Sequence, residues 1–175
     1  MILPVAVLAL LPAAAPAASH PSRILTEGVW CEPASGTPAN CLRLRNGSAT
    51  LDNPIDSGSN DPGNAEDVAL QALNVLYLNK YPEYRLEFRD HPGICLGLTS
   101  GTGPNSGLTE VKDCSGPDPF AYGTTWAYDG TNAYFINVRV SNAMGSLQVL
   151  ESQQRGAQCF LNFEAGLSEE HWTMR

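Results

Sequence analysis

Three histidines are the side chains of this sequence best suited to moving protons near neutral pH. His20 lies close to the amino terminus, His91 lies in the segment Asp90–Gly93, and His171 stands between Glu170 and Trp172. A glutamate beside a histidine suggests acid–base chemistry, but neighbours in a strand face opposite sides of a sheet. The sequence Asp-His-Pro-Gly around His91 is typical of a turn. The histidines therefore predict no catalytic pair.

Known catalytic motifs do not occur in the sequence. It has no Gly-x-Ser-x-Gly turn, no His-Glu-x-x-His metal motif and no glycine-rich phosphate loop. Its 18 acidic residues make chance pairs of carboxylates easy, so a small glycosidase is the weakest alternative. We therefore predict that the protein is not an enzyme and that it holds no metal and no cofactor.

Five cysteines offer a second kind of chemistry. In an oxidising compartment, this odd number predicts two disulfides and one thiol. The most local pairs are Cys31 with Cys41 and Cys95 with Cys114, although the sequence alone leaves the connectivity open. Cys159 is then the remaining thiol, and its place in an apolar strand predicts that it is buried. The absence of a Cys-x-x-Cys motif argues against a zinc site and against a thioredoxin-like redox site.

The first residues have the features of a secretory signal peptide. Residues 2–11 are almost all apolar, and Ala15–Ala17 fits the cleavage pattern. We expect a signal peptide over residues 1–17 and a single secreted, extracellular domain over residues 18–175. A membrane anchor and a buried first strand are the alternatives, but the apolar run is shorter than the roughly 20 residues that a bilayer needs.

The charge of the chain argues against two classes of partner. The formal net charge is −8, and the ten Lys and Arg residues are scattered without a basic stripe. Nucleic acids and anionic membrane surfaces both require clustered positive charge. No later apolar segment is long enough to span a membrane. We expect neither a nucleic-acid partner nor a transmembrane segment, and we expect Asn46, in an Asn-Gly-Ser sequon, to be a glycosylation site.

Most of the expected mature sequence has the pattern of short strands separated by turns. Apolar residues alternate over three segments, residues 84–88, 108–111 and 135–140, and Asp129 with Gly130 marks a tight turn. Residues 64–74 fit either element, because they begin like a helix but also alternate like a strand. Residues 54–63 are rich in Asp, Ser and Asn, and they predict a long polar loop.

Three short runs repeat along the chain at similar spacing. They are Cys41–Leu44, Cys95–Leu98 and Ser146–Val149, which start 54 and 51 residues apart. An aromatic residue that starts a strand follows each run, at Tyr77, Trp126 and Trp172. Each unit therefore predicts four short strands, with the long loop in the first unit. Three such units, each unable to bury its apolar face alone, predict an all-β domain with three pseudo-repeats around a pseudo-threefold axis, a β-trefoil.

In these repeats the sequence resembles the ricin B-chain-like β-trefoil lectins. The family pattern is Cys-Leu-Asp-Val, then an apolar strand that ends in Cys, then Gln-x-Trp. The middle unit is the most similar, with Cys95–Leu98, then Leu108–Cys114, then Thr124–Trp126. The resemblance covers most of the expected mature chain. It implies a disulfide between Cys95 and Cys114, core positions for Trp126 and Trp172, and glycans or glycoproteins as partners.

The sugar-binding residues of this family are only partly matched. Its lectins use an Asp two residues after the first Cys, and here that position holds Arg43, Gly97 or Gln148. The third unit departs least from the pattern, because Gln148, Glu169 and Glu170 are able to hydrogen-bond a polyol. These three are the candidate carbohydrate-binding residues. Ordinary solvated surface is the alternative interpretation for them.

Two functions therefore compete. The resemblance implies a secreted, lectin-like carbohydrate-binding protein. The poor match of the sugar-binding residues favours the alternative, a β-trefoil inhibitor that binds a secreted protease through an exposed loop. Residues 54–63 or 101–107 would form that loop. A shared fold does not choose between these functions.

Overall fold

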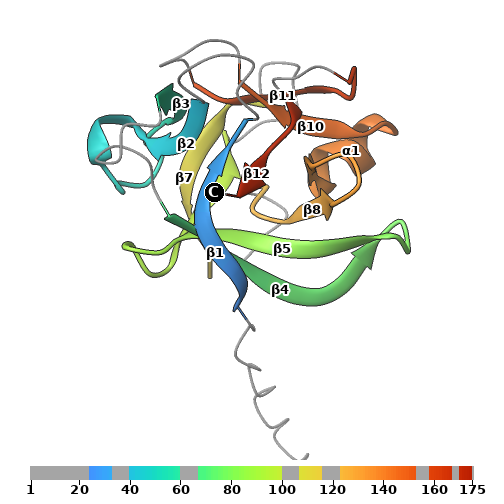
Figure 1. Ribbon diagram of the computed structural model, residues 1–175, viewed down its shortest axis with the longest axis horizontal. Helices are drawn as coiled ribbons and strands as arrows, with labels where there is room; N and C mark the ends of the chain where they lie inside the picture. Colours follow the sequence, from blue (N-terminus) through green and yellow to red (C-terminus); the bar gives the residue numbers. More distant parts are fainter. Residues whose placement is uncertain are drawn as a thin grey trace, which may run out of the picture.

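The computed structural model describes residues 24–32, 40–59, 67–99, 107–115, 123–152, 158–166 and 170–174. The expected signal peptide over residues 1–17 lies outside these residues. The described chain forms twelve strands and one short α-helix (Figure 1). The strands are β1 (Ile24–Cys31), β2 (Asn40–Leu44), β3 (Ile55–Ser59), β4 (Asp67–Tyr77), β5 (Tyr81–Phe88), β6 (Ile94–Leu98), β7 (Thr109–Asp113), β8 (Trp126–Asp129), β9 (Tyr134–Asn137), β10 (Gln148–Glu151), β11 (Phe160–Phe163) and β12 (Thr173–Met174). The helix α1 (Val138–Met144) lies between β9 and β10, and a short 3-10 turn (Arg45–Gly47) follows β2.

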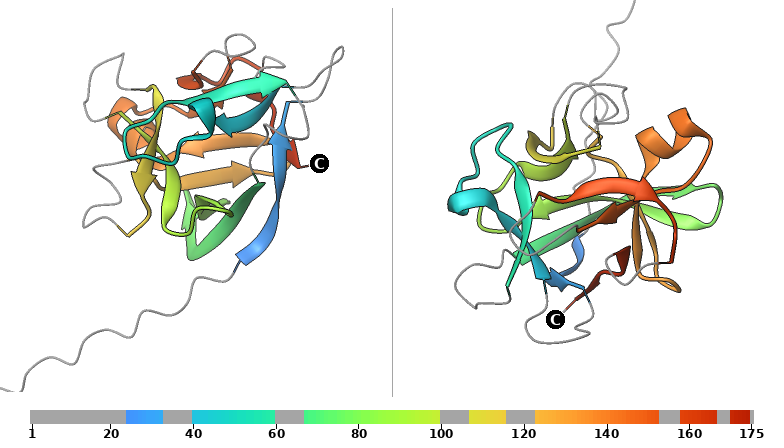
Figure 2. Two further views of the ribbon diagram at one scale, coloured as in Figure 1. Left: turned by 90° about the vertical axis from the view of Figure 1, so that its left-hand side faces the viewer. Right: turned by 90° about the horizontal axis from the view of Figure 1, so that it is seen from above.

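The twelve strands divide into three units of four consecutive strands. The first and fourth strands of the units make a ring, in which β1 pairs with β4, β4 with β5, β5 with β8, β8 with β9, and β12 with β1. The ring is closed by a backbone hydrogen bond, in which the N–H of Trp172, just before β12, donates to the carbonyl oxygen of Ala133, just before β9, at 2.7 Å. The second and third strands make three hairpins, β2–β3, β6–β7 and β10–β11. Seen from above, these hairpins lie on different sides of the molecule (Figure 2, right). This arrangement confirms the all-β, β-trefoil prediction.

Two tryptophans anchor the core in the same way in two units. Trp126 and Trp172 are fully buried, as predicted. The indole Nε1 of Trp126 donates to the carbonyl oxygen of Leu96 at 2.9 Å, and that of Trp172 donates to the carbonyl oxygen of Leu150 at 2.9 Å. Because buried N–H groups need partners, each pair fixes a barrel strand to a hairpin of its own unit.

These pairs correct the register predicted for the third unit. Leu42, Leu96 and Leu150 all lie in the main core cluster and follow one another at intervals of 54 residues. The counterpart of Cys95–Leu98 is therefore 149–152, so the run Ser146–Val149 was placed three residues too early. The place predicted for Tyr77 is also wrong, since this residue packs in a second, smaller cluster at the far end of β4.

The structure resolves the ambiguous segment and corrects two others. Residues 67–77 are a strand, β4, which pairs with β1 on one edge and β5 on the other. The expected loop over 54–63 is wrong in its first half, where β3 pairs with β2 and buries Asp56 against the guanidinium of Arg45.

The strand expected over 135–140 stops at Asn137, and α1 begins at Val138. The side chain of Asn137 caps the helix by accepting from the backbone N–H of Val140 at 3.1 Å. Gly145 ends the helix in a left-handed conformation, with a φ of 68°. Local caps thus override the alternating pattern of this segment.

Both local cysteine pairs are disulfides. Cys31 is joined to Cys41 and Cys95 to Cys114, with Cα–Cα distances of 4.0 and 5.1 Å. Cys159 is a buried free thiol, as predicted. Within the described part of the chain, no helix is long and apolar enough to cross a membrane, and no group of three His, Cys, Asp or Glu side chains is placed to hold a metal ion.

Candidate functional site

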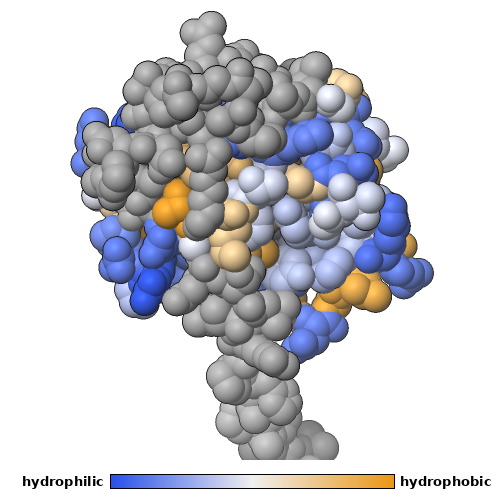
Figure 3. Space-filling view, viewed as in Figure 1, coloured by the Kyte–Doolittle hydropathy of each residue, from blue (hydrophilic) through white to orange (hydrophobic). Residues whose placement is uncertain are grey.

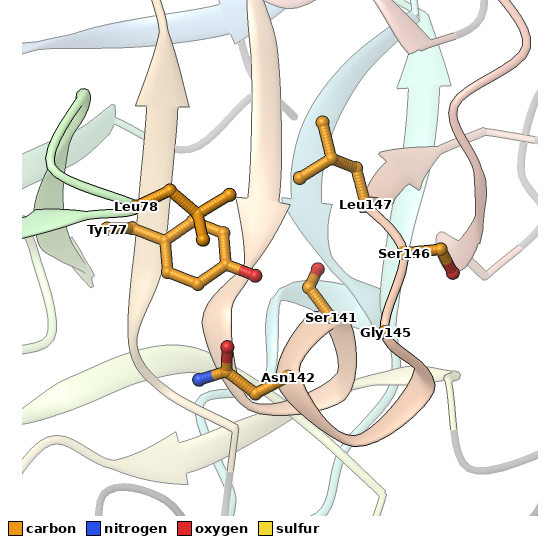
Figure 4. A pocket seen from close by; sticks show the side chains of 7 residues that line it. All are labelled: Tyr77, Leu78, Ser141, Asn142, Gly145, Ser146 and Leu147. Carbon is orange, nitrogen blue, oxygen red and sulfur yellow. The ribbon is translucent and has the colours of Figure 1, made fainter.

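A pocket lies where the end of the β4–β5 hairpin meets α1 (Figure 4). Its volume is about 280 Å³. The residues that line it are Tyr77, Leu78, Ser141, Asn142, Gly145, Ser146 and Leu147. Figures 1 and 2 both place the hairpin end and α1 at the same side of the molecule. In the second unit a short turn connects the first strand, β5, to the second strand, β6. In the third unit α1 forms the corresponding connection, between β9 and β10, so the pocket lies where the third unit differs from the second.

A strained turn forms one side of this pocket. Leu78 and Asn79 have φ values of 52° and 54°, and the N–H of Lys80 donates to the carbonyl oxygen of Tyr77 at 3.0 Å. Two central residues with positive φ are typical of the turn that joins tight hairpins. Asn or Gly usually fills such positions, and a bulky residue is strained there. Leu78 is nevertheless held at the pocket with 63% of its surface exposed.

The helix α1 and the segment after it form the other side. The hydroxyl of Ser141 accepts a hydrogen bond from the backbone N–H of Gln148 at 2.9 Å, which fixes α1 to the start of β10. Asn142 follows on the exposed surface of the helix. Gly145 turns the chain back, so that Ser146 and Leu147 close the pocket.

The lining combines neutral polar groups with apolar ones. Tyr77 packs against Ala127 and Ile136, is only 7% exposed, and directs its hydroxyl toward Ser141 (Figure 4). Tyr77 therefore contributes its hydroxyl to the pocket, while most of its ring is buried. The amide of Asn142 adds both a donor and an acceptor, and none of the lining residues is charged. Such a lining suits a neutral, hydroxyl-rich ligand better than an ion.

The predicted sugar-binding residues lie in other surroundings. Gln148 is buried and donates from Nε2 to the hydroxyl of Ser146 at 3.2 Å, so it supports the pocket wall without lining it. Glu170 is fully buried, and its carboxylate accepts from the backbone N–H groups of Ala165 and Gly166 at 2.9–3.1 Å. Glu169 lies outside the described residues.

The corrected register changes which residue stands at the family's Asp position. In the third unit this residue is Glu151, on β10, and not Gln148. Glu151 is mostly buried, and its carboxylate accepts from the Nδ2 group of Asn162 on β11 at 2.8 Å. In the other units this position holds Arg43, whose side chain packs over Gly58, and the buried Gly97.

Buried charges elsewhere hold strands and turns together. Lys112 donates to Asp52 and, at 2.9 Å, to Glu110. Burial alone would lower the pKa of Lys112, but these hydrogen bonds raise it overall, so the amine stays charged. Burial raises the pKa of the Cys159 thiol far above its ordinary range, and Glu32 adds to the effect. Neither group is a nucleophile at neutral pH.

The remaining predicted residues also have clear positions. Asn46 is exposed in the short turn after β2, with a φ of 57°. His91 lies in the turn between β5 and β6, as predicted. His171 precedes β12 and packs edge-on against the ring of Tyr134, with 5.1 Å between ring centroids.

Sequence reasoning found the third unit but missed the pocket residues. The helix caps Asn137 and Gly145 were the available signal for α1. Nothing in the sequence places Tyr77 beside Ser141, because the two residues are 64 positions apart and meet only through the folded ring.

Comparisons with known proteins bear on the fold alone. No protein-family model matches the sequence, and no curated protein matches it. Among solved structures, the chain is similar to a designed threefold-symmetric protein, ThreeFoil, with a TM-score of 0.60 and 18% identity over 83% of this chain and 95% of that one. The similarity to this threefold-symmetric structure supports the β-trefoil fold, but it does not show membership of the ricin B family.

Proposed function

We propose that the protein is a secreted carbohydrate-binding protein that holds a neutral sugar in the pocket between the β4–β5 hairpin and α1. The observation that carries the proposal is the lining of this pocket. It brings the hydroxyls of Tyr77 and Ser141 and the amide of Asn142 beside Leu78 and Leu147, without a charged side chain. Hydroxyl and amide groups hydrogen-bond a polyol, and apolar side chains cover the C–H groups of a sugar ring.

Secretion is part of the same proposal. Both disulfides are formed, and disulfides persist in oxidising compartments. The N-terminal sequence supports the same location, since residues 1–17 have the pattern of a signal peptide. Likeness to the ricin B lectins supports the class of ligand by analogy only.

The proposal is tested by a glycan array on the secreted, disulfide-intact protein. We expect selective binding of neutral glycans, reduced at least tenfold by Asn142→Ala. Leu51→Ala is the matched control, because Leu51 is an exposed residue that does not line the pocket. Loss of binding in Glu151→Gln instead would move the sugar to the third-unit hairpin. A flat array with folded protein contradicts the proposal.

Protease inhibition is the second candidate, and one observation favours it. The end of the β4–β5 hairpin exposes Val75, Leu76 and Leu78, each by more than half. An exposed apolar hairpin is able to enter the cleft of an enzyme. Of the two loops predicted for this role, residues 55–59 are instead strand β3, and residues 60–63 and 101–106 lie outside the described residues. Inhibition of a secreted protease that is abolished by Leu76→Asp would support this candidate.

A further inference from the structure

Half of the large apolar side chains that are exposed in the described part of the chain lie on the β4–β5 hairpin and α1. Large hydrophobic residues are exposed at eight described positions, and four of these lie on the two elements that line the pocket. The four are Val75, Leu76 and Leu78 at the hairpin end and Met144 on α1. Figure 3 shows an orange patch at the end of the β4–β5 hairpin, at the right, beside hydrophilic surface. Clustered apolar surface of this kind marks a binding region.

Leu78 is the most informative of these residues. It belongs to none of the three clusters of buried apolar residues, so packing does not explain a leucine at this position. Its positive φ strains the backbone, whereas Asn or Gly would fit the turn without this strain. Strained residues of this kind are concentrated at ligand-binding sites. A leucine at this place offers an exposed apolar side chain to a ligand.

Polar and apolar groups occupy different depths of the pocket. Tyr77 and Ser141 are almost entirely buried, and their hydroxyls form the polar floor (Figure 4). Leu78 forms the rim and is 63% exposed. Met144 does not line the pocket, but it is 52% exposed and stands three residues after Ser141, which places it on the same side of α1. A ligand with a polar head and an apolar chain matches this order.

We infer that the pocket takes an amphiphilic glycoside, a neutral sugar that carries an alkyl or acyl chain. This inference rests on the proposed function, since it places the sugar on the polar floor. The alkyl or acyl chain of the ligand then runs outward over Leu78 and Met144. A lining without charged residues agrees with a glycoside, and it does not suit the head group of a fatty acid or a phospholipid.

The test is a calorimetric titration with methyl, hexyl and octyl glycosides of glucose, galactose, mannose and N-acetylglucosamine, each below its micelle concentration. Each methylene that becomes fully buried tightens binding about fourfold. We expect the octyl form of the preferred sugar to bind at least tenfold more tightly than its methyl form. Octyl tetraethylene glycol, which has the chain without the sugar, is expected to bind at least tenfold more weakly than the octyl glycoside.

Two variants test whether the alkyl chain of the ligand lies over Leu78 and Met144. Met144→Gln is expected to leave methyl glycoside binding unchanged, because Met144 does not line the pocket that holds the sugar. It is expected to reduce the octyl-to-methyl ratio at least threefold, because it removes exposed apolar surface beside the pocket. Leu78→Asn is expected to reduce the same ratio at least threefold and to raise the urea midpoint, because Asn relieves the strain of the turn. This second readout shows that the variant is folded.

The outcomes separate the inference from the proposed function. Tight methyl glycoside binding with no chain-length effect overturns the inference and leaves the proposed function intact. An unchanged octyl-to-methyl ratio in both variants also overturns it, and so does equal binding of octyl tetraethylene glycol. If no glycoside of any chain length binds, the result contradicts both the inference and the proposed function.

Discussion

The indole Nε1 of Trp172 donates a hydrogen bond to the carbonyl oxygen of Leu150, at 2.9 Å, in the fully buried core. Trp126 and Leu96 make the same contact in the second unit, at the same distance. The relationship ties the last short strand to the hairpin of its own unit. It also defines the true interval between units, which the sequence pattern missed by three residues in the third unit.

Trp172→Phe should destabilise the protein by about 2–4 kcal/mol. The substitution removes the indole donor, leaves the Leu150 carbonyl without its partner and opens a cavity. Urea unfolding followed by circular dichroism measures the change, and Trp126→Phe should give a similar loss. A loss below about 0.5 kcal/mol in both variants, which is ordinary for a surface substitution, would show that these contacts are dispensable.

Glu170→Gln should lower stability and leave glycan binding unchanged. The carboxylate of Glu170 accepts from two backbone N–H groups, that of Ala165, which is shared between both oxygens, and that of Gly166. Hydrogen bonds to a charged acceptor contribute about 1.5–3 kcal/mol each. Thermal unfolding and titration with the preferred glycoside test the two parts separately. A selective loss of affinity without a loss of stability would instead make Glu170 a sugar ligand.

Removal of the Cys95–Cys114 disulfide should cost about 3 kcal/mol. The bond closes a segment with a sequence separation of 19 residues, and the loop-entropy estimate gives this value. The Cys95→Ser/Cys114→Ser variant, compared with the native protein in urea, provides the measurement. The Cys31–Cys41 bond spans 10 residues, so its removal should cost slightly less. The reverse order would mean that strand pairing, not loop length, governs the contribution.

Cys159 should resist thiol reagents in the folded protein. Burial raises the pKa of this thiol above the ordinary value of 9.0, so the folded state keeps the proton at a pH where the unfolded chain loses it. Its contribution to stability is thus complete below about pH 9 and declines as the pH rises further. Labelling with a disulfide reagent at pH 8 should be at least a thousandfold slower than in denaturant. Rapid labelling of native protein would contradict the burial of Cys159.

Asn46 should carry a glycan when the chain is secreted from a eukaryotic cell. Asn46 and Gly47 are exposed in the 3-10 turn after β2, and Ser48 completes the sequon directly after this turn. Mass spectrometry before and after amidase treatment measures occupancy, with Asn46→Gln as the control. An unchanged mass in a well-secreted preparation would rule out modification at this site.

The trefoil was predictable because its determinants repeat along the chain. Alternating apolar residues, turn sequences and the Leu42 and Leu96 runs are local features that agree with one another. Both disulfides were also predictable, because each joins two cysteines that are neighbours along the sequence. The burial of Trp126 and Trp172 followed from the repeat position and from the general tendency of large aromatic residues.

The site was less predictable because its residues come from different units. Val138 and Val140 alternate as in a strand, but the caps at Asn137 and Gly145 convert the segment into α1. The helix leaves the interval of 54 residues between Leu96 and Leu150 unchanged, and it forms one side of the pocket. Glu170 has the chemistry of a sugar ligand, yet its backbone partners become visible only in three dimensions.

The pairing of β12 with β1 also determines where the chain can be cut. Met174 pairs with Trp30 across this joint, so the first and last strands of the described chain lie side by side in one ladder. A circular permutant that links β12 to β1 and opens the turn Arg89–Gly93 should keep every strand pair. In the natural order, by contrast, the ring closes through a strand of only two residues. A mechanical load applied at the carboxyl end would therefore open the barrel at this joint first, with the remaining pairs still intact.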